Sequence, residues 1–282
     1  MTRLQSLISP TRPMIMGILN ATPDSFSDGG LHFQRDEAVA KGLSMAEEGA
    51  DIIDVGGEST RPGSNPVSGE EQLARVVPVI RELRLGLPER VLISVDTTLC
   101  TVAAAALDAG ADFINDISAG RDDPGMLPLA AARRVPIVLM HMQGVPKTMQ
   151  DSPSYQDVVS EVMDFLVERA RLGEAAGIPR EHIILDPGIG FGKRRDDNLT
   201  LLAHMDRFAA SGYKILLGTS RKRFMGAVCH ESEPQHLVAA TVATTALGVG
   251  AGVRLFRVHD VRENRQAADV AHAICQAYQP AP

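Results

Sequence analysis

Tryptophan is absent from the 282-residue chain, and aromatic residues make up only 4% of it. The core must therefore be built from Ala, Val, Ile, Leu and Met, and a composition of 44% hydrophobic and 22% charged residues is normal for a globular protein. Cysteine is also scarce, since Cys100, Cys229 and Cys275 lie far apart with neither a Cys-x-x-Cys pair nor zinc-site spacing. An odd number of isolated cysteines favours a reducing compartment, so we expect a cytoplasmic protein.

The chain also lacks a long apolar segment. Residues 1–13 do not contain the apolar core of a secretion signal. The longest uncharged run, 237–253, is interrupted by threonines and glycines and is too short to span a bilayer, so we expect a buried helix that leads into a strand. Acidic residues outnumber basic ones, with a net charge of −7, which argues against a nucleic-acid partner. We therefore expect neither a membrane nor a nucleic acid as partner.

Short apolar segments alternate with longer segments of helical periodicity throughout the chain. Most of the short segments are apolar at consecutive positions, which is typical of parallel strands covered on both faces. The candidate strands are 14–19, 51–55, 92–95, 113–115, 137–140, 183–185, 214–217 and 253–258. Eight such units without a linker predict an α/β fold, a single (β/α)8 TIM barrel over residues 1–282 with its core at about 14–278. A doubly wound open sheet is the alternative, because periodicity does not reveal whether a sheet closes.

One expected helix carries two opposite signals. Ser68 followed by Glu71 has the form of a capping box, and apolar residues then recur at helical spacing from 73 to 83. Pro78 lies inside this run and should kink the helix or confine it to part of the run, because proline has no N–H to donate.

Polar residues follow all eight candidate strands, where a TIM barrel has its active site. Any one of them could be an ordinary helix cap or turn, and a lysine or arginine after a strand is usually solvated. Their convergence on one rim favours a function. Arg61, Arg221, Lys222, Arg257 and His259 supply positive charge, whereas Asp96, Asn115 and Asp186 supply carboxylates and an amide. This division predicts an anionic, phosphorylated ligand with a ring rich in N–H groups, because a carboxylate can accept two parallel N–H bonds.

The residues around these positions closely resemble the dihydropteroate synthase family. The matching segments are MGILNATPDSFSDG at 16–29, IDVGGESTRPG at 53–63, SVDT at 94–97, INDI at 114–117, LMHMQG at 139–144, LDPG at 185–188, SRK at 220–222 and RVHD at 257–260. They occur in the family's order over almost the whole chain, and the first two are long and specific. Small departures, such as Ala21, Leu99 and Ile189, remove no charged residue.

The resemblance implies a transferase of folate biosynthesis, usually a homodimer and a sulfonamide target. It would condense (7,8-dihydropterin-6-yl)methyl diphosphate with 4-aminobenzoate to give 7,8-dihydropteroate and diphosphate. The implied cofactor is Mg²⁺, with Asn20 as its ligand. By motif, the pterin diphosphate would contact Thr60, Arg61, Asp96, Asn115, Asp186, Lys222, Arg257 and His259. The 4-aminobenzoate pocket would contain Phe26, Pro62, Phe191 and Ser220, and the catalytic residues would be Lys222, Arg257, His259 and Asp96.

An electron-rich dihydropterin can stabilise a carbocation, so we expect loss of diphosphate to precede attack by the arylamine, as in an SN1 reaction. The protein's main task would then be to stabilise the departing diphosphate. The sequence leaves two rival functions. A barrel that transfers a methyl group from a folate to a corrinoid would not need the cations at 220–222 and 257–259. The other alternative is a non-catalytic paralogue that binds pterin or regulates a partner, although the complete set of polar and charged site residues weighs against it.

Overall fold

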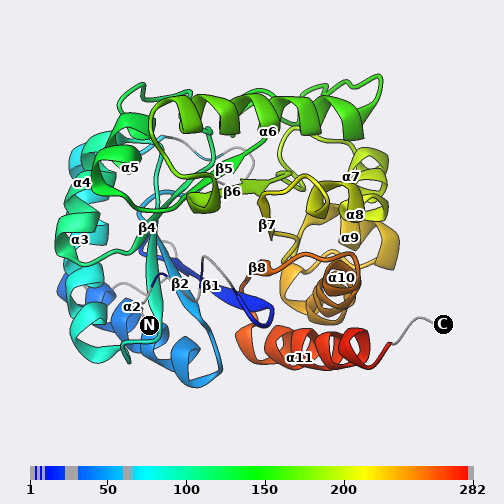
Figure 1. The fold of residues 1–282 in the computed structure, drawn as a ribbon. Helices are drawn as coiled ribbons and strands as arrows, with labels where there is room; N and C mark the ends of the chain where they lie inside the picture. Colours follow the sequence, from blue (N-terminus) through cyan, green and yellow to red (C-terminus); the bar gives the residue numbers. More distant parts are fainter. Residues whose placement is uncertain are drawn as a thin grey trace.

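The computed structural model describes residues 4, 7, 10–22, 31–59, 64 and 66–278, without the side chains of residues 31–34. Parallel strands form a closed barrel at its centre (Figure 1). They are β1 (Met14–Asn20), β2 (Ile52–Gly56), β3 (Leu92–Asp96), β4 (Phe113–Asp116), β5 (Ile137–Met140), β6 (Ile183–Asp186), β7 (Lys214–Leu217) and β8 (Leu255–Val258). Because β1 pairs with β8 as well as with β2, the sheet has no open edge, which confirms the TIM barrel and excludes the doubly wound sheet.

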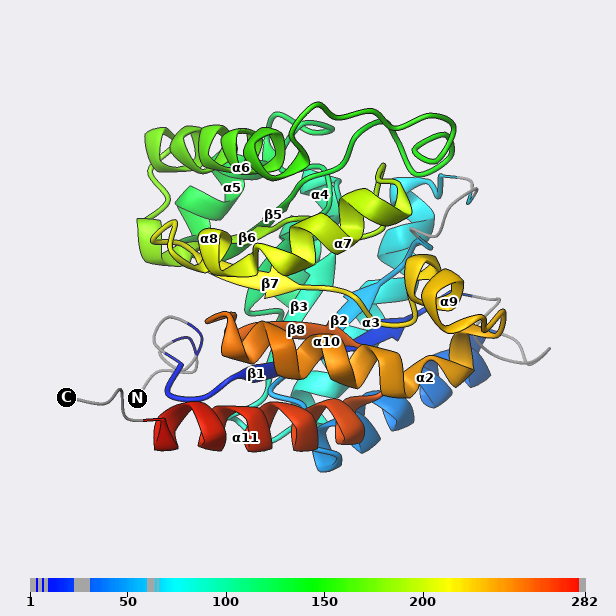
Figure 2. The same cartoon turned by 90° about the vertical axis from the view of Figure 1, so that its right-hand side faces the viewer.

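Helices surround the barrel on its outside (Figures 1 and 2). They are α2 (Leu31–Glu47), α3 (Gly69–Gly86), α4 (Cys100–Ala109), α5 (Met126–Arg133), α6 (Val158–Ala175), α7 (Arg195–Ala203), α8 (Met205–Ala209), α9 (Arg223–Cys229), α10 (Val238–Gly250) and α11 (Val261–Ala277). Two short 3-10 helices, η2 (Arg180–His182) and η3 (Pro234–His236), precede β6 and α10. No helix in the described part of the chain has both the length and the apolar character needed to cross a bilayer.

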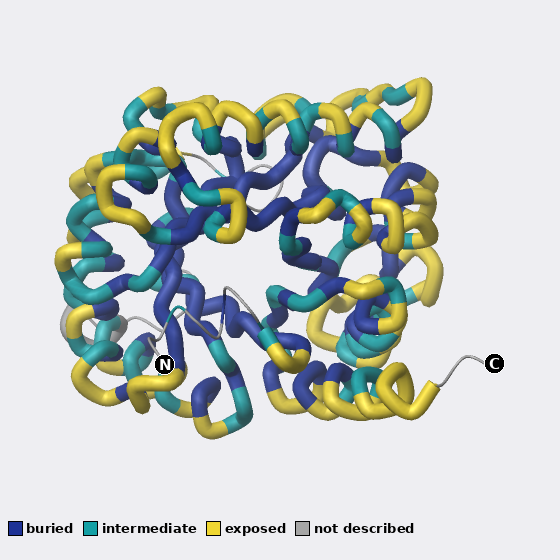
Figure 3. The backbone as a smooth tube through the Cα atoms, in the orientation of Figure 1, coloured by how far each residue is buried: buried dark blue, intermediate teal, exposed yellow. Residues whose placement is uncertain are grey.

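The strands are buried on both faces and the helices are exposed on their outer faces (Figure 3). Outward-facing strand residues such as Ile53, Val95 and Phe256 belong to a large apolar cluster that also contains the inner faces of the helices. A second, smaller cluster fills the barrel interior. Its members are Leu7, Met14, Met16, Ile52, Leu92, Phe113, Val138, Ile184, Leu216 and Leu255. Burial on both sides explains why the strands appear in the sequence as continuous apolar runs.

Inside the barrel, the side chains change from apolar to polar toward the carboxyl ends of the strands. Residues two apart on a strand face the same side. Interior apolar residues are therefore followed two positions later by polar ones, as in the pairs Ile52 and Asp54, Leu92 and Ser94, Phe113 and Asn115, Ile184 and Asp186, and Leu255 and Arg257. The site therefore lies above a layer of apolar side chains in the barrel interior, which we call the apolar floor.

Two expectations about helices need correction. Helix α3 runs without a break from Gly69 to Gly86 through Pro78, so confinement to part of the run, one of the two effects expected of the proline, is wrong. Its start was expected correctly, since the Ser68 hydroxyl accepts a hydrogen bond from the Glu71 N–H. Segment 237–253 forms α10 followed by a turn, but the helix is buried on one face only, because Leu247 is 74% exposed.

Candidate functional site

A cavity of about 690 Å³ opens at the carboxyl ends of the strands. Eight of the residues expected at the site line it, namely Asn20, Asn115, Asp186, Phe191, Ser220, Lys222, Arg257 and His259. They come from strands or loops on different sides of the barrel, and their convergence on one opening is the arrangement that the sequence predicted. Four further expected residues, Phe26, Thr60, Arg61 and Pro62, lie outside the described residues.

A buried carboxylate, Asp54, organises the inner wall of the cavity. Its side chain is fully buried on β2. Oδ2 of Asp54 accepts hydrogen bonds from Nε of Arg257 at 2.6 Å and from Nδ2 of Asn115 at 3.1 Å. Oδ1 accepts the Ser94 hydroxyl at 2.5 Å. The amide nitrogen of Asn115 donates to the Asp54 carboxylate. The amide oxygen of Asn115 therefore points away from Asp54, where it can act as an acceptor.

Asp96 lies behind Arg257 and does not itself line the cavity. Nη2 of Arg257 donates to Oδ2 of Asp96 at 2.7 Å, so this guanidinium joins two buried carboxylates. Burial raises the pKa of Asp96 to about 7, against the opposing effect of Arg257 and with a further increase from Asp54. Burial alone would lower the pKa of Arg257, but the neighbouring carboxylates raise it, so the arginine stays charged.

Asp186 and Lys222 both line the cavity. Oδ1 of Asp186 accepts the N–H of Gly188 at 2.7 Å, and burial raises the pKa of Asp186 to about 6 although Gly188 and Lys222 lower it. Burial and then Arg257 lower the pKa of Lys222 to about 8, which the two aspartates oppose. The Lys222 amine lies 4.0 Å from the centre of the Phe191 ring, a cation–π contact.

The outer rim is braced between the ends of β7 and β8. The Ser220 hydroxyl contacts Nδ1 of His259 at 2.9 Å and accepts the His259 backbone N–H at 3.1 Å. Arg221 has a left-handed backbone (φ 57°) and forms a two-pronged ion pair with Asp260, with bonds of 3.0 and 2.5 Å. Arg221 therefore joins the two loops, whereas His259 and Ser220 present a polar edge to the cavity.

Asn20 ends β1 and lines the cavity, where an amide oxygen suits a hard cation such as Mg²⁺. No cluster of three or more His, Cys, Asp or Glu side chains that could hold a metal ion occurs within the described ranges. A cation that takes most of its ligands from water and phosphate oxygens needs no such cluster, since Mg²⁺ sites often use one or two protein oxygens. The donor set therefore fits Mg²⁺ bound together with an anionic substrate.

Two residues of the site were missed in the sequence. Asp54 lies inside a candidate strand, whereas only residues after the strands were considered, although its spacing of two from Ile52 shows that it faces inward. Lys193 follows β6 and was given no role, because a lysine after a strand is usually solvated, but it is only 3% exposed and lines the cavity. Burial lowers the pKa of Lys193 to about 7, and Asp186 opposes this shift.

The arrangement can bind a flat ring and an anion at once. The Asn115 amide and the Asp186 carboxylate can accept N–H donors from a ring. Lys222, Arg257 and the polar edge at Ser220 and His259 surround the opening above it. A ligand with a hydrogen-bonding ring and a phosphate group would match both parts of this cavity.

The sequence matches the family model described as "Pterin binding enzyme" over residues 16–259. The dihydropteroate synthases of Synechocystis and Escherichia coli K12 are both 43% identical to it, over 93% and 95% of this chain and 90% and 93% of their own length. A probable bifunctional folylpolyglutamate synthase/dihydropteroate synthase of Haloferax volcanii is 48% identical over 92% of this chain, which spans only 30% of that longer protein.

Solved structures agree with this match. A Xanthomonas albilineans dihydropteroate synthase with 4-aminobenzoic acid has a TM-score of 0.89 at 49% identity, and the alignment covers 95% of each chain. A structure of that enzyme in complex with 7,8-dihydropteroate has a TM-score of 0.85 at 45% identity, with 96% of each chain covered. The family model and these relatives cover nearly the whole barrel and its cavity. The chain belongs to the dihydropteroate synthase family of pterin-binding enzymes.

Proposed function

We propose that this protein condenses (7,8-dihydropterin-6-yl)methyl diphosphate with 4-aminobenzoate, giving 7,8-dihydropteroate and diphosphate. It is a transferase of folate biosynthesis, as its dihydropteroate synthase relatives are. The observation that carries this function is the single cavity in which acceptors for a ring, at Asn115 and Asp186, share one opening with the cations Lys222 and Arg257.

The pterin ring would lie on the polar layer above the apolar floor. Asp186 would accept N–H groups of the ring through Oδ2, because Gly188 already occupies Oδ1. Asn115 would offer its oxygen, whose direction is fixed by the bond from its amide nitrogen to Asp54. Asp96 would act from behind Arg257, by holding the guanidinium in place.

The diphosphate would be held by cations at the opening. Arg257 uses Nε and Nη2 for the two aspartates, and its Nη1 is bonded to no other residue in the described ranges, so this group is available to a phosphate oxygen. His259 would add a polar contact from the end of β8. By the family resemblance, Thr60 and Arg61 would join this group.

4-Aminobenzoate would bind above the pterin, against the Phe191 ring and beside Ser220, with Phe26 and Pro62 completing its pocket by resemblance. Its amine is neutral near pH 7 and needs little help from a base. Lys222, above the ring and against Phe191, would stabilise the negative charge of the leaving group as the C–O bond breaks. Loss of diphosphate would precede attack, and exclusion of water would protect the cation that forms.

Mg²⁺ would be bound by Asn20 and, when present, would neutralise charge on the diphosphate.

We also propose a cytoplasmic location, which the three free cysteines support. A homodimer is supported by apolar side chains exposed on the adjacent helices α10 and α11 (Figure 2), which are Leu247, Val270 and Ile274. Analytical ultracentrifugation of the purified protein tests this, and a monomer at micromolar concentration would contradict it.

The decisive experiment incubates the purified protein with dihydropterin diphosphate, Mg²⁺ and labelled 4-aminobenzoate. Labelled 7,8-dihydropteroate should form in proportion to the enzyme added, with one diphosphate released per product. A Lys222→Ala variant of unchanged circular dichroism is the control. Absence of labelled product from the wild type, or equal product from the variant, would contradict the proposed reaction or the proposed role.

A further inference from the structure

Lys193 is a buried lysine to which the reaction above assigns no role. It ends the loop between β6 and α7, and it is 3% exposed. Its amine lies 2.9 Å from the Gly188 carbonyl, 3.0 Å from the Phe191 carbonyl and 2.9 Å from Nδ1 of His141. A fourth, longer contact of 3.4 Å runs to the His141 carbonyl, so every N–H of this nitrogen has an acceptor within reach. A buried lysine with such a complete set of partners holds specific groups together.

His141 is the partner that ties the loop to another strand. It follows β5, and the pKa of its ring is strongly lowered by burial and then by Lys193 and Arg121. The ring is therefore neutral and can accept a hydrogen bond at Nδ1. Its other face contacts Phe165 of α6 edge-on, with ring centres 4.9 Å apart. Lys193 thus links the β6–α7 loop to a ring that is itself fixed by packing.

The backbone of this loop leaves little room for adjustment. Gly188 and Gly192 have left-handed φ angles of 66° and 58°, and a Cβ on them would lie 1.9 Å from the His141 carbonyl oxygen and 2.2 Å from that of Gln143. The loop is therefore packed directly on the segment that follows β5. This close contact requires glycine, and it turns the Gly188 and Phe191 carbonyls toward the lysine.

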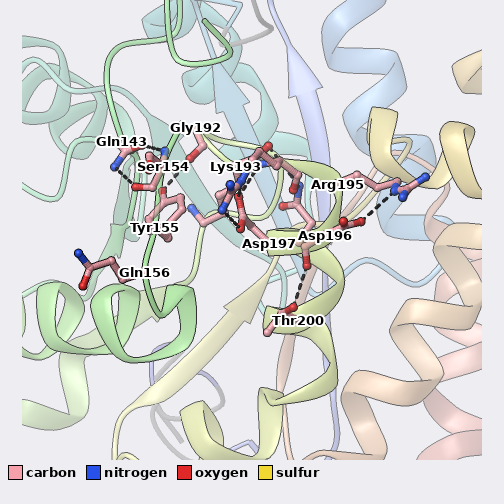
Figure 4. A network of polar contacts seen from close by, with 12 residues as sticks. Gln143, Ser154, Tyr155, Gln156, Gly192, Lys193, Arg195, Asp196, Asp197 and Thr200 are labelled. Atoms are coloured by element: carbon pink, nitrogen blue, oxygen red, sulfur yellow. Dashed lines mark hydrogen bonds and ion pairs between the residues drawn. The ribbon is translucent and has the colours of Figure 1, made fainter. Parts of the chain in front are cut away.

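Further hydrogen bonds hold the loop from the outside, where Figure 4 shows Tyr155 beside Gly192 and Lys193. The Tyr155 hydroxyl donates to the Gly192 carbonyl at 2.7 Å. Gly190 accepts a bond from the Gln150 side chain at 2.8 Å and donates one to the Asn198 side chain at 2.7 Å. Lys193 approaches the same loop from within the molecule, where it is buried.

The same loop carries the aromatic wall of the cavity. Phe191 lines the cavity, and its ring lies 4.0 Å from the Lys222 amine. A Cβ at Gly190 would lie 3.0 Å from Cδ of Lys222, so the loop backbone also touches the stem of that lysine. A shift of the loop would therefore move the ring and displace Lys222.

We propose that Lys193 is a positioning residue, whose three hydrogen bonds hold the Phe191 ring in place as the wall against which 4-aminobenzoate binds. This role rests on the proposed placement of 4-aminobenzoate beside Phe191. Of the proposed pterin contacts, Asn115 lies on β4, to which no described hydrogen bond of Lys193 runs, whereas Asp186 is reached only through Gly188, whose N–H donates to Asp186 and whose carbonyl accepts from Lys193. Loss of the amine should therefore weaken binding of one substrate more than that of the other.

The test compares Lys193→Met with Lys214→Met in the intact protein. Lys214 is a matched control, since its amine also donates to a backbone carbonyl, that of Glu181 at 2.5 Å, but at the amino end of β7. We expect Lys193→Met to raise KM for 4-aminobenzoate by about tenfold, which corresponds to about 1.4 kcal/mol. KM for the pterin diphosphate should change by less than about threefold, and Lys214→Met should change neither.

His141→Phe gives a second route to the same result, because it removes one acceptor of Lys193 and keeps a ring against Phe165. It should raise KM for 4-aminobenzoate in the same direction by a smaller factor, about threefold. If Lys193→Met fails to fold, the KM values of His141→Phe decide whether Lys193 has the positioning role. Unchanged KM values in a folded variant, or an equal rise for both substrates, would overturn the positioning role.

Phe191→Ala separates this inference from the proposed function on which it rests. If it leaves KM for 4-aminobenzoate unchanged, the proposed placement of that substrate is wrong, and the role of Lys193 falls with it. If Phe191→Ala raises this KM and Lys193→Met does not, the placement stands and the inference alone is wrong. A rise in both variants, with Lys214→Met unchanged, supports the inference.

Discussion

Replacing Asp54 with asparagine would test how much of the site depends on a side chain that no ligand can reach. Asp54 is fully buried, and its carboxylate receives Ser94, Asn115 and Arg257. Asparagine has nearly the same shape. Its oxygen can take the place of Oδ2, and its NH₂ group can donate to the Ser94 hydroxyl, which also accepts. The substitution therefore removes the charge and leaves the number of hydrogen bonds almost unchanged.

The expected loss follows from the two bonds on Oδ2, at 2.6 Å to Arg257 and 3.1 Å to Asn115. A hydrogen bond to a charged group contributes about 1.5–3 kcal/mol, and a neutral one about 0.5–1.5 kcal/mol. Each bond should weaken by about 1 kcal/mol, so the free energy of unfolding should fall by roughly 2 kcal/mol. Affinity for the pterin diphosphate should fall about tenfold, because Asn115 and Arg257 are then less well oriented.

Urea denaturation followed by circular dichroism measures the stability, and isothermal titration calorimetry measures the affinity. Ser94→Ala is the control, since it removes the bond to Oδ1 and keeps both bonds to Oδ2. This control should lower the free energy of unfolding by about 1 kcal/mol and leave affinity within about twofold. If Asp54→Asn bound the pterin diphosphate as the wild type does, or if Ser94→Ala weakened binding equally, the orienting role of Asp54 would be refuted.

Three other predictions concern pH, catalysis and the metal. Burial raises the pKa of Asp186 from 3.8 to about 6, so its proton stabilises the folded state fully below about pH 4, and this stabilisation is lost as the pH rises through 6. Because ring N–H groups need the ionised form, affinity for the pterin diphosphate should rise from pH 5 to 7, and the contribution of Asp186 to the melting temperature of the ligand-free protein should fall over the same range. Asp186→Asn should make both profiles less steep in calorimetry, and the slope that remains belongs to other buried groups such as Asp96. Lys222→Ala should lower kcat by about 10²-fold or more with an unchanged circular dichroism spectrum, and steady-state kinetics near wild type would contradict its role. Asn20→Ala should raise the Mg²⁺ concentration that gives half-maximal activity by about tenfold, and an unchanged Mg²⁺ titration would show that the ion does not depend on this amide.

Much of the barrel could be predicted because its strands are buried on both faces. Consecutive apolar residues, as in Ile137–Met140, mark such strands directly, and all eight candidates lie within two residues of the observed ones. Closure was predicted from the number of units and the family resemblance, but it does not follow from periodicity, because it depends on the pairing of β1 with β8 across the full length of the chain. The exposure of α10 was missed for a similar reason, since apolar composition does not reveal which face has neighbours.

Site residues near the ends of the strands could be predicted from the sequence. Site residues that lie deeper in the barrel interior, or that are buried by the folding of a loop, could not. Asn115, Asp186 and Arg257 lie where their strands end or just before, so barrel geometry alone brings them together. Asp54 lies lower in the same interior, among residues that the sequence marks only as core. Lys193 looked like an ordinary surface lysine, because its burial depends on how the glycines of its loop fold back onto the segment after β5.

The apolar floor beneath the polar layer limits the directions in which an inhibitor could grow. Phe113, Ile184 and Leu216 fill the barrel below the level of Asn115 and Asp186, so a compound that replaces the ring cannot extend deeper. Added groups would have to project outward between the loops. Substitutions that weaken binding of a compound at the inner wall would also destabilise the folded barrel. Substitutions that weaken binding of a compound at the loops would do little damage to the enzyme.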